Sequence, residues 1–223
     1  MKLFSHNILA TLYFNFKMLP WRQAFHLPFI FYGKVRFVRT NGKIIFSNSI
    51  ALGTIRIGSQ GCEMFPNRTS VIDIGGTLKI DGASIRLGAG SILRIENTGT
   101  ILLKDKCRIG ANTILFSENL IEIGENTGVS WNCQLMDTDT HSIQDIATEH
   151  IKARSAPIII GKHCWIGNHV IINKGTILPD YSTIASLSLC NKNYTGIAPS
   201  FSILGGIPAK VLAYGKRRMD DKL

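Results

Sequence analysis

The sequence predicts an all-β fold, a parallel β-helix, and three observations support this prediction. Between residues 160 and 189 an aliphatic residue falls on every sixth position, namely Ile160, Ile166, Ile172, Leu178 and Ile184. Ile and Gly recur along the chain after about residue 35, where strong helix formers are not concentrated. One interval, 131–157, breaks the repeat, which resumes directly afterwards. We therefore expect a regular coil with one inserted loop.

A period of six residues suits neither an α-helix, which repeats every 3.6 residues, nor hairpins with irregularly spaced turns. In a parallel β-helix each six-residue unit forms one short strand and one corner, and three units close one coil. The residue after each aliphatic is mostly small or turn-compatible, as at Gly161 and Gly167. The residue four positions after each aliphatic residue is small or β-branched, as at Cys164 and Val170. We therefore expect the aliphatic side chains to point inward and form a continuous core.

The same phrase recurs less regularly upstream, as "IGSQGC" at 57, "IGGTLK" at 74, "IDGASI" at 80, "LGAGSI" at 87, "IGANTI" at 109 and "IGENTG" at 123. Because the intervals between these starts differ, the N-terminal coils are expected to carry insertions or bulges.

The length of 223 residues predicts one domain with a short appendage. We expect an N-terminal helical segment at 1–40, a β-helix at 41–213 and a basic C-terminal tail at 214–223. Residues 3–19 place four apolar side chains on one helical stripe: Ile8, Leu12, Phe16 and Leu19. This helix is open to two interpretations. It either caps the end of the β-helix, or it lies in a membrane interface and holds the protein near a lipid-linked sugar.

The net charge of +10 favours anionic partners, namely phosphorylated cofactors, lipid head groups or nucleic acid, and charge alone does not choose among them. The five cysteines form no CxxC pair and are odd in number, which favours small buried thiols in a reduced, cytoplasmic protein. Cys107, Cys133 and Cys164 fall where the repeat requires a small inward residue. No apolar run is long enough to predict a membrane-spanning helix.

The phrase "PIIIGKHCWIGNHVIINKGTILPDYSTIASLS" and the closing "GGIPAKVL" resemble the left-handed β-helix, hexapeptide-repeat acyltransferases. The resemblance covers about residues 44–213. It is greatest to the maltose and galactoside acetyltransferase-like group, which includes enzymes of capsule, exopolysaccharide and O-antigen synthesis. It implies a left-handed coil and a homotrimer with acetyl-CoA in the groove between neighbouring β-helices. It also implies O-acetylation of a sugar or lipid-linked glycan without a metal or a nucleic-acid partner. The expected location is the cytoplasm or the inner face of the membrane.

The resemblance implies that His141, in the stretch "MDTDTHSI", is the general base. When a sugar hydroxyl attacks a thioester carbonyl its proton must be accepted, and an imidazole suits this task. Asp139 or Asp137 could fix the tautomer of the ring. If the segment is extended, alternation places both carboxylates and the imidazole on one side. Contact with the sugar and shaping of the loop are alternative tasks for these aspartates.

The resemblance also implies which residues bind CoA. The matching positions are Trp165, Asn168, Ser186, Lys192 and Lys210. The two lysines suit phosphate groups, with a solvated basic face as the alternative. Trp165 is equally suited to stacking or to packing between subunits. The stretch "ASLSLCNKNYTGIAPSFS" departs from the family pattern, which leaves the contacts there open.

Three other functions remain open from the sequence. The first is N-acylation of a sugar, which needs similar base chemistry. The second is a metal-dependent hydratase resembling the β-helix carbonic anhydrases, for which His163 and His169 are the candidate ligands. Because these histidines are one repeat apart, they are expected on different faces of the coil, and we predict no metal ligand. The third is a non-catalytic assembly platform.

Overall fold

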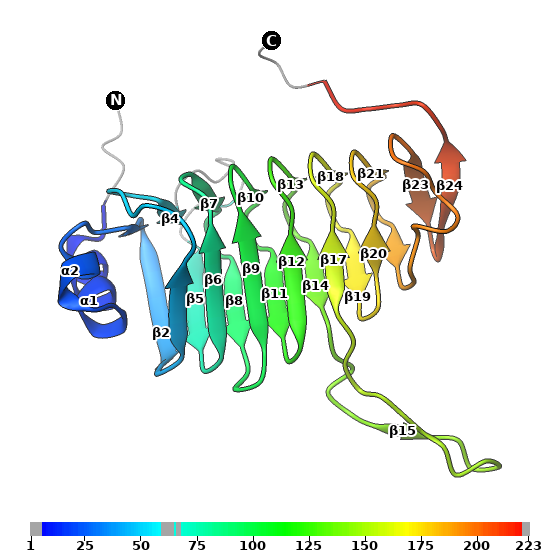
Figure 1. Cartoon of the computed structure of the whole chain (residues 1–223), viewed down its shortest axis with the longest axis horizontal. Coiled ribbons are helices and arrows are strands. Elements are labelled where there is room, and N and C mark those ends of the chain that lie inside the picture. Colours follow the sequence, from blue (N-terminus) through cyan, green and yellow to red (C-terminus); the bar gives the residue numbers. More distant parts are fainter. Residues whose placement is uncertain (1–5, 59–64, 66–67, 220–223) are drawn as a thin grey trace.

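A computed structural model describes residues 6–58, 65 and 68–219 and shows a parallel β-helix (Figure 1). Among these residues the first sheet contains, in spatial order, β1 (Phe29–Phe31), β4 (Ile55–Ile57), β7 (Ile85–Leu87), β10 (Arg108–Ile109), β13 (Gly128–Val129), β18 (Trp165–Ile166), β21 (Thr183–Ile184), β23 (Ile203–Gly206) and β24 (Ala209–Ala213). The second contains β2 (Lys34–Thr40), β5 (Thr69–Ile74), β8 (Ile92–Ile95), β11 (Ile114–Ser117), β14 (Gln134–Met136), β19 (Ile171–Asn173) and β22 (Leu189–Cys190). The third contains β3 (Lys43–Phe46), β6 (Thr77–Asp81), β9 (Thr100–Lys104), β12 (Leu120–Ile123), β17 (Ile158–Ile160) and β20 (Ile177–Leu178).

Each coil adds one strand to each sheet, and the coils stack in parallel register. Leu135 of β14 pairs with Ile172 of β19, which pairs in turn with Cys190 of β22. The repeated aliphatic positions are at most 2% exposed, and they are Ile160, Ile166, Ile172, Leu178 and Ile184. The predicted parallel β-helix with an inward column of aliphatic side chains is therefore confirmed.

The N-terminal coils are wider than the regular C-terminal coil. Ile92 pairs with Ile114, so this turn takes 22 residues, whereas Ile171 pairs with Leu189 after 18 residues. The register of β2 against β5 also shifts between Phe37 and Thr40. These features confirm the insertions and bulges that the irregular upstream phrases predict.

Two of the three corners of the coil contain a run of residues with positive φ. The corner between the third and first sheets contains Lys106, Asn126, His163, Tyr181 and Phe201, and the corner between the first and second contains Asn112, Asn132, His169 and Leu187. At the first of these corners the His163 ring stacks on Tyr181 with centroids 4.8 Å apart. His163 and His169 thus lie at different corners, as the spacing predicts.

Two helices, α1 (Ile8–Met18) and α2 (Trp21–Ala24), cover the N-terminal end of the coil (Figure 1). The outer edge of β1 has backbone groups that the sheet leaves unpaired, and α1 satisfies them. The Asn15 side chain donates to the carbonyl of Phe29 at 2.8 Å and accepts from its N–H at 3.1 Å. Thr11 Oγ1 accepts from the N–H of Phe31 at 3.1 Å. The buried Phe14 ring packs edge-on against the rings of Phe29 and Phe31.

The stripe of Ile8, Leu12, Phe16 and Leu19 does not form the buried face of α1, since its first three members are exposed. The buried face of α1 instead contains Phe14, together with Thr11 and Asn15, whose side chains form hydrogen bonds with the edge of β1. The helical part ends at Ala24, and the strands β1 and β2 already lie within the 1–40 segment. None of the described helices is long and apolar enough to cross a membrane.

The four described cysteines are buried and free, and they are Cys107, Cys133, Cys164 and Cys190. Burial raises the pKa of the Cys164 thiol to about 12 and that of Cys133 to about 11. Their role in packing is therefore confirmed, while Cys62 lies outside the described residues.

Candidate functional site

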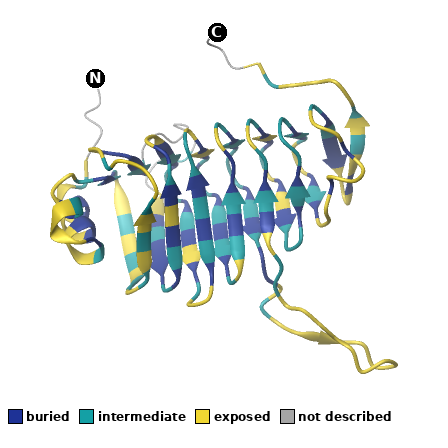
Figure 2. Cartoon of the chain, in the orientation of Figure 1, coloured by how far each residue is buried: buried dark blue, intermediate teal, exposed yellow. Residues whose placement is uncertain are grey.

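The coil is interrupted at its third corner, between β14 and β17, by an arm that we define as residues 138–156. The arm contains a hairpin of β15 (Ile143–Gln144) and β16 (Ile151–Lys152). It projects away from the coil (Figure 1), and its outer part is exposed to solvent (Figure 2). The predicted insertion at 131–157 is thus confirmed, although the strand before it continues to Met136.

Asp137 directly precedes the arm and is fully buried. Its carboxylate accepts hydrogen bonds from Ser117 Oγ at 2.7 Å, from the Glu118 N–H at 2.7 Å and from the Asn119 N–H at 2.9 Å. Burial raises the pKa of the Asp137 carboxyl, and these hydrogen bonds oppose the rise. The side chain therefore joins the start of the arm to the same corner of the preceding coil.

Polar contacts hold the base of the arm. Lys174 Nζ lies 2.6 Å from Asp139 Oδ2 and donates to the carbonyl of Ala153 at 2.6 Å. Arg154 Nε lies 3.1 Å from Glu118 Oε2, and the carbonyl of Arg154 accepts from the N–H of Asp139 at 2.8 Å. Hydrogen bonds and ion pairs therefore connect the outgoing and returning segments of the arm to each other. They also connect the arm to the preceding coil and to the following coil.

The chain turns sharply at Thr140, directly before the candidate base. Thr140 has a φ of 61°, in the left-handed region where a β-branched residue is strained. Its N–H donates to Thr138 Oγ1 at 2.9 Å, and its hydroxyl donates to the carbonyl of Asp139 at 2.6 Å. The segment is therefore not extended, and the alternation that would place Asp137 and His141 on one side does not apply.

His141 lies just beyond this turn and is exposed. Among the residues that the structure describes, no side chain or backbone group forms a hydrogen bond with its imidazole. Both carboxylate oxygens of Asp137 already accept hydrogen bonds from residues 117–119, and Asp139 pairs with Lys174. A single chain therefore presents the predicted base on a braced arm without a partner that orients its ring.

Three of the five predicted CoA residues lie together on the first sheet and the corner that follows it. Trp165 in β18 is 42% exposed, and its Nε1 donates to Ser130 Oγ at 3.3 Å. Asn168 Oδ1 accepts from Ser186 Oγ at 2.5 Å, and Asn168 Nδ2 lies 2.8 Å from His169 Nδ1. We call the exposed Trp165 on β18, together with the hydrogen-bonded pair of Asn168 and Ser186 at the corner that follows, the donor corner.

The two predicted phosphate ligands belong to other elements. Lys192 follows β22 at the third corner and places its Nζ 5.6 Å from the centre of the Tyr194 ring. Lys210 is exposed in β24, the antiparallel strand that ends the first sheet. Lys192 therefore lies at a different corner from the donor corner, whereas Lys210 lies in the first sheet, separated from β21 by β23.

The arm and the donor corner lie at opposite edges of the coil. In Figure 1 the arm leaves the lower edge, whereas β18 and β21 lie along the upper edge. The strands of the second sheet, among them β14 and β19, therefore lie between the corner where the arm leaves the coil and the donor corner.

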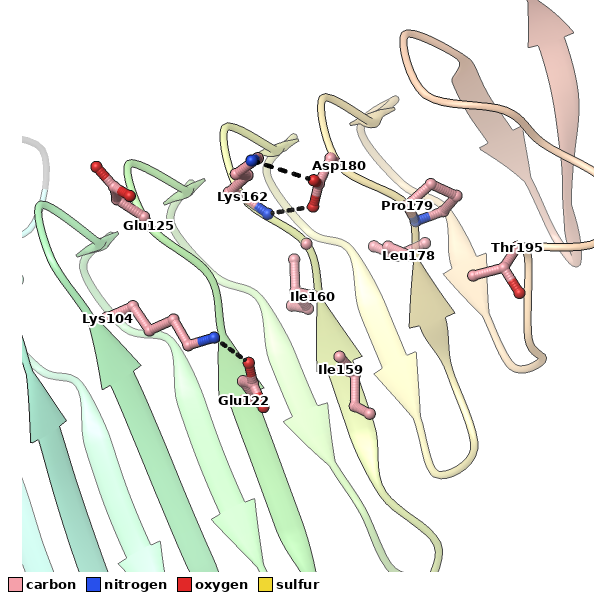
Figure 3. A pocket seen from close by; sticks show the side chains of 11 residues that line it. Lys104, Glu122, Glu125, Ile159, Ile160, Lys162, Leu178, Pro179, Asp180 and Thr195 are labelled. Carbon is pink, nitrogen blue, oxygen red and sulfur yellow. Dashed lines mark hydrogen bonds and ion pairs between the residues drawn. The ribbon is translucent and has the colours of Figure 1, made fainter.

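A pocket of about 470 Å³ opens on the third sheet (Figure 3). Ion pairs line it, with Lys104 Nζ 2.6 Å from Glu122 Oε1 and Lys162 Nζ 3.8 Å from Asp180 Oδ2. None of the predicted site residues lies among those that line this pocket.

Comparison with known proteins relates the chain to acetyltransferases, although no family model matches it. It is 30% identical over 101 residues to galactoside O-acetyltransferase from Escherichia coli (strain K12), which is 45% of this chain and 47% of the relative. The matched segment therefore spans about half of that relative. The chain is 27% identical over 139 residues to a putative colanic acid biosynthesis acetyltransferase, WcaF, from the same strain, which covers 60% of this chain and 71% of WcaF.

Solved structures show the same fold. The polysialic acid O-acetyltransferase OatWY matches with a TM-score of 0.53 and 17% identity, over 85% of this chain and 93% of OatWY. A mutant of AntD, an N-acyltransferase from Bacillus cereus crystallised with dTDP and coenzyme A, matches with a TM-score of 0.51 and 18% identity, over 78% of this chain and 84% of AntD. The coil is left-handed, as the resemblance implies. The chain is therefore similar in sequence to acetyltransferases, and it shares the β-helix fold of the solved acyltransferases.

Proposed function

We propose that this protein is an acetyl-CoA-dependent O-acetyltransferase that acts on a hydroxyl group of a sugar or glycan precursor. The observation that carries the proposal is the exposed His141 on an arm that leaves the coil at the edge opposite the donor corner. In a homotrimer the arm of one subunit reaches the donor corner of the next. Cyclic symmetry then creates three equivalent sites.

The proposed reaction is direct transfer. His141 accepts the proton of the sugar hydroxyl while the hydroxyl oxygen attacks the thioester carbonyl carbon. The carbon–sulfur bond then breaks, and the CoA thiolate leaves and takes up a proton. Asp137 acts as a positioning residue, since it fixes the start of the arm to the preceding corner. Asp139 acts through its ion pair with Lys174, which holds the base of the arm in place.

The composition of the arm supports contact with a second subunit. Its outer part exposes three isoleucines, Ile143, Ile146 and Ile151, and Ile146 is 89% exposed in the single chain. Apolar side chains gathered on a projecting hairpin are typical of a surface that a partner covers. At the donor corner, Trp165 offers a flat apolar face to a long ligand, and the Asn168 and Ser186 pair offers polar groups beside it.

Two findings favour the acetyl donor and the sugar acceptor. Two of the relatives are acetyltransferases named for a galactoside and for colanic acid. The AntD structure contains coenzyme A on the same fold. Lys192 and Lys210 remain candidates for its phosphate groups, contributed from the third corner and from β24.

A second candidate is N-acylation of an amino sugar, which the likeness to AntD favours. The two reactions share the acyl donor and the base, and they differ in the nucleophile. A hydroxyl acceptor gives an ester, whereas an amine gives an amide.

The proposal is tested by incubating the full chain with acetyl-CoA and a panel of sugars and amino sugars while measuring free CoA. We expect release that depends on a hydroxylated acceptor and a product whose acetyl group is removed by mild alkali. An alkali-stable product would favour the amide and N-acylation. Absence of acceptor-dependent release, together with absence of CoA binding by calorimetry, would contradict both candidates.

A further inference from the structure

The outer face of the N-terminal cap exposes an apolar patch that the coil does not use. We define the cap patch as Ile8, Leu9, Leu12, Tyr13, Phe16, Trp21 and Phe25, all of which are exposed. Leu9 is 82% exposed and Trp21 is 73% exposed. Figure 2 shows the exposed outer side of α1 and α2 and the buried side that faces the coil. The buried side caps β1, and the part of the chain that the structure describes leaves the cap patch exposed.

Aromatic rings form the centre of the cap patch. The Phe16 ring packs edge-on against Trp21 at 5.8 Å and against Phe25 at 5.3 Å between centroids. Tyr13 extends the patch toward the first coil, where its ring lies 5.4 Å from that of Phe37. Clustered Trp, Tyr and Phe side chains beside a leucine are typical of groups that enter the boundary between lipid head groups and acyl chains.

The charged side chains of the cap and of the first coil itself have one sign. Before Glu63 the sequence contains eight Lys or Arg residues and no Asp or Glu. Those exposed on the cap and on the first coil are Lys17, Arg22, Lys34, Arg36 and Lys43. An apolar patch among basic side chains is complementary to an anionic bilayer. A second copy of the cap would carry the same positive charge and would be repelled.

We propose that the cap patch binds the surface of an anionic lipid bilayer, with α1 and α2 lying in the interface and the coil extending away from it. The helices occupy the N-terminal end of the coil (Figure 1), so the arm and the donor corner remain accessible along its sides. Apolar insertion and electrostatic attraction together meet the requirement of two signals for stable peripheral binding. In the proposed homotrimer three caps share one end, which increases the avidity for a membrane. The inference does not depend on the chemistry at His141.

The test is co-sedimentation of the full chain with vesicles of phosphatidylglycerol and phosphatidylcholine, compared with vesicles of phosphatidylcholine alone. We expect binding to the anionic vesicles at low salt and weakening of this binding as salt is added. The paired change Lys17→Gln with Arg22→Gln should lower partitioning roughly 25-fold, at about five-fold for each charge. The paired change Leu9→Ser with Trp21→Ser should lower it by at least about ten-fold.

Matched controls lie at the other end of the molecule. Leu212→Ser with Tyr214→Ser replaces side chains of similar exposure, 62% and 61%, and Lys216→Gln with Arg217→Gln removes two exposed charges. These controls should bind like the wild type. Absence of binding to anionic vesicles at low salt would overturn the proposal, as would equal losses in the controls. If Leu9→Ser with Trp21→Ser instead dissociates a larger assembly in the absence of lipid, the occupant of the patch is another copy and the proposal is wrong.

Discussion

The regular coil from Ile158 to Cys190 and the arm at 138–156 are stabilised in different ways. The coil is stabilised by burial, since its repeated aliphatic side chains are almost inaccessible to solvent. The arm buries little of its surface and is held by hydrogen bonds and ion pairs at its base. A rigid solenoid thus supports an exposed segment whose chemistry is free of the packing constraint. Substitutions in the coil should therefore change stability, whereas those in the outer arm should change turnover.

The largest expected effect is on turnover. His141→Ala should lower kcat by roughly 10²- to 10⁴-fold, because it removes the proposed general base. The melting temperature and the affinity for CoA should not change, because the ring is exposed and forms no hydrogen bond or ring contact with the described residues. Steady-state kinetics, thermal melting and calorimetry measure these three quantities.

His150→Ala is the matched control, since His150 is also exposed on the arm. It should retain nearly the activity of the wild type. Full turnover in the variant of His141 would contradict its assignment as the base.

The next effect is on stability. Ile172→Ala in β19 should lower the free energy of unfolding by about 2–5 kcal/mol, because it removes a fully buried side chain from the centre of the coil. Ile171→Ala, at a neighbouring position that is 42% exposed, should change it by less than about 0.5 kcal/mol. Equilibrium urea unfolding of both variants tests the contrast, which equal losses would refute.

A smaller effect is expected from the carboxylate that joins the coil to the arm. The pKa of Asp137 is raised in the folded state, so folding favours its protonated form. The stability that this carboxyl contributes through its protonated form is fully present below the pKa that Asp137 has in the unfolded chain. It is lost as the pH rises through the higher pKa that Asp137 has in the folded protein. Asp137→Asn does not titrate. The stability of the wild type relative to this variant should therefore fall as the pH rises from the ordinary aspartate range.

Urea unfolding of both proteins at a series of pH values measures this difference, in which the other titrating groups largely cancel. A relative stability that rises over the same range would contradict the direction of the pKa shift.

The smallest effect is expected at the ion pair of Lys174 and Asp139 at the base of the arm. Lys174→Met should increase the rate of proteolytic cleavage within the arm, because it removes contacts with Asp139 and Ala153. A partly exposed pair of this kind contributes about 1 kcal/mol or less, so the increase should be at most about five-fold. Lys162→Met, which removes a longer pair on the coil, should leave the rate unchanged. Equal cleavage of all three proteins would show that the pair does not brace the arm.

The coil could be predicted from the sequence because burial repeats with the geometry of the fold. Where each turn takes 18 residues, each inward position is visible as an aliphatic residue six positions from the last. The N-terminal coils were predicted only in outline, since their longer turns and the shift in β2 obscure the period. The orientation of α1 was missed because Asn15 and Thr11, which are polar, form part of its buried face.

The candidate site was predicted less completely. The break in the repeat located the arm, and the resemblance selected His141. The burial of Asp137 depends on Ser117 and its neighbours, which only the stacking of coils brings near. Lys174 was missed for the same reason, since its pairing with Asp139 requires the next coil to lie against the base of the arm. A pattern of neighbouring residues in the sequence does not reveal contacts between residues of different coils.

The central claim is that the arm of one subunit completes the site at the donor corner of another. Two inactive variants test it directly, His141→Ala and the paired change Trp165→Ala with Asn168→Ala, each made in the full chain. When equal amounts are assembled together, random mixing should restore about one quarter of the wild-type activity, because each site needs an intact arm and an intact donor corner from different subunits. Mixed assemblies that form, as shown by two affinity tags, but recover no activity would contradict the account.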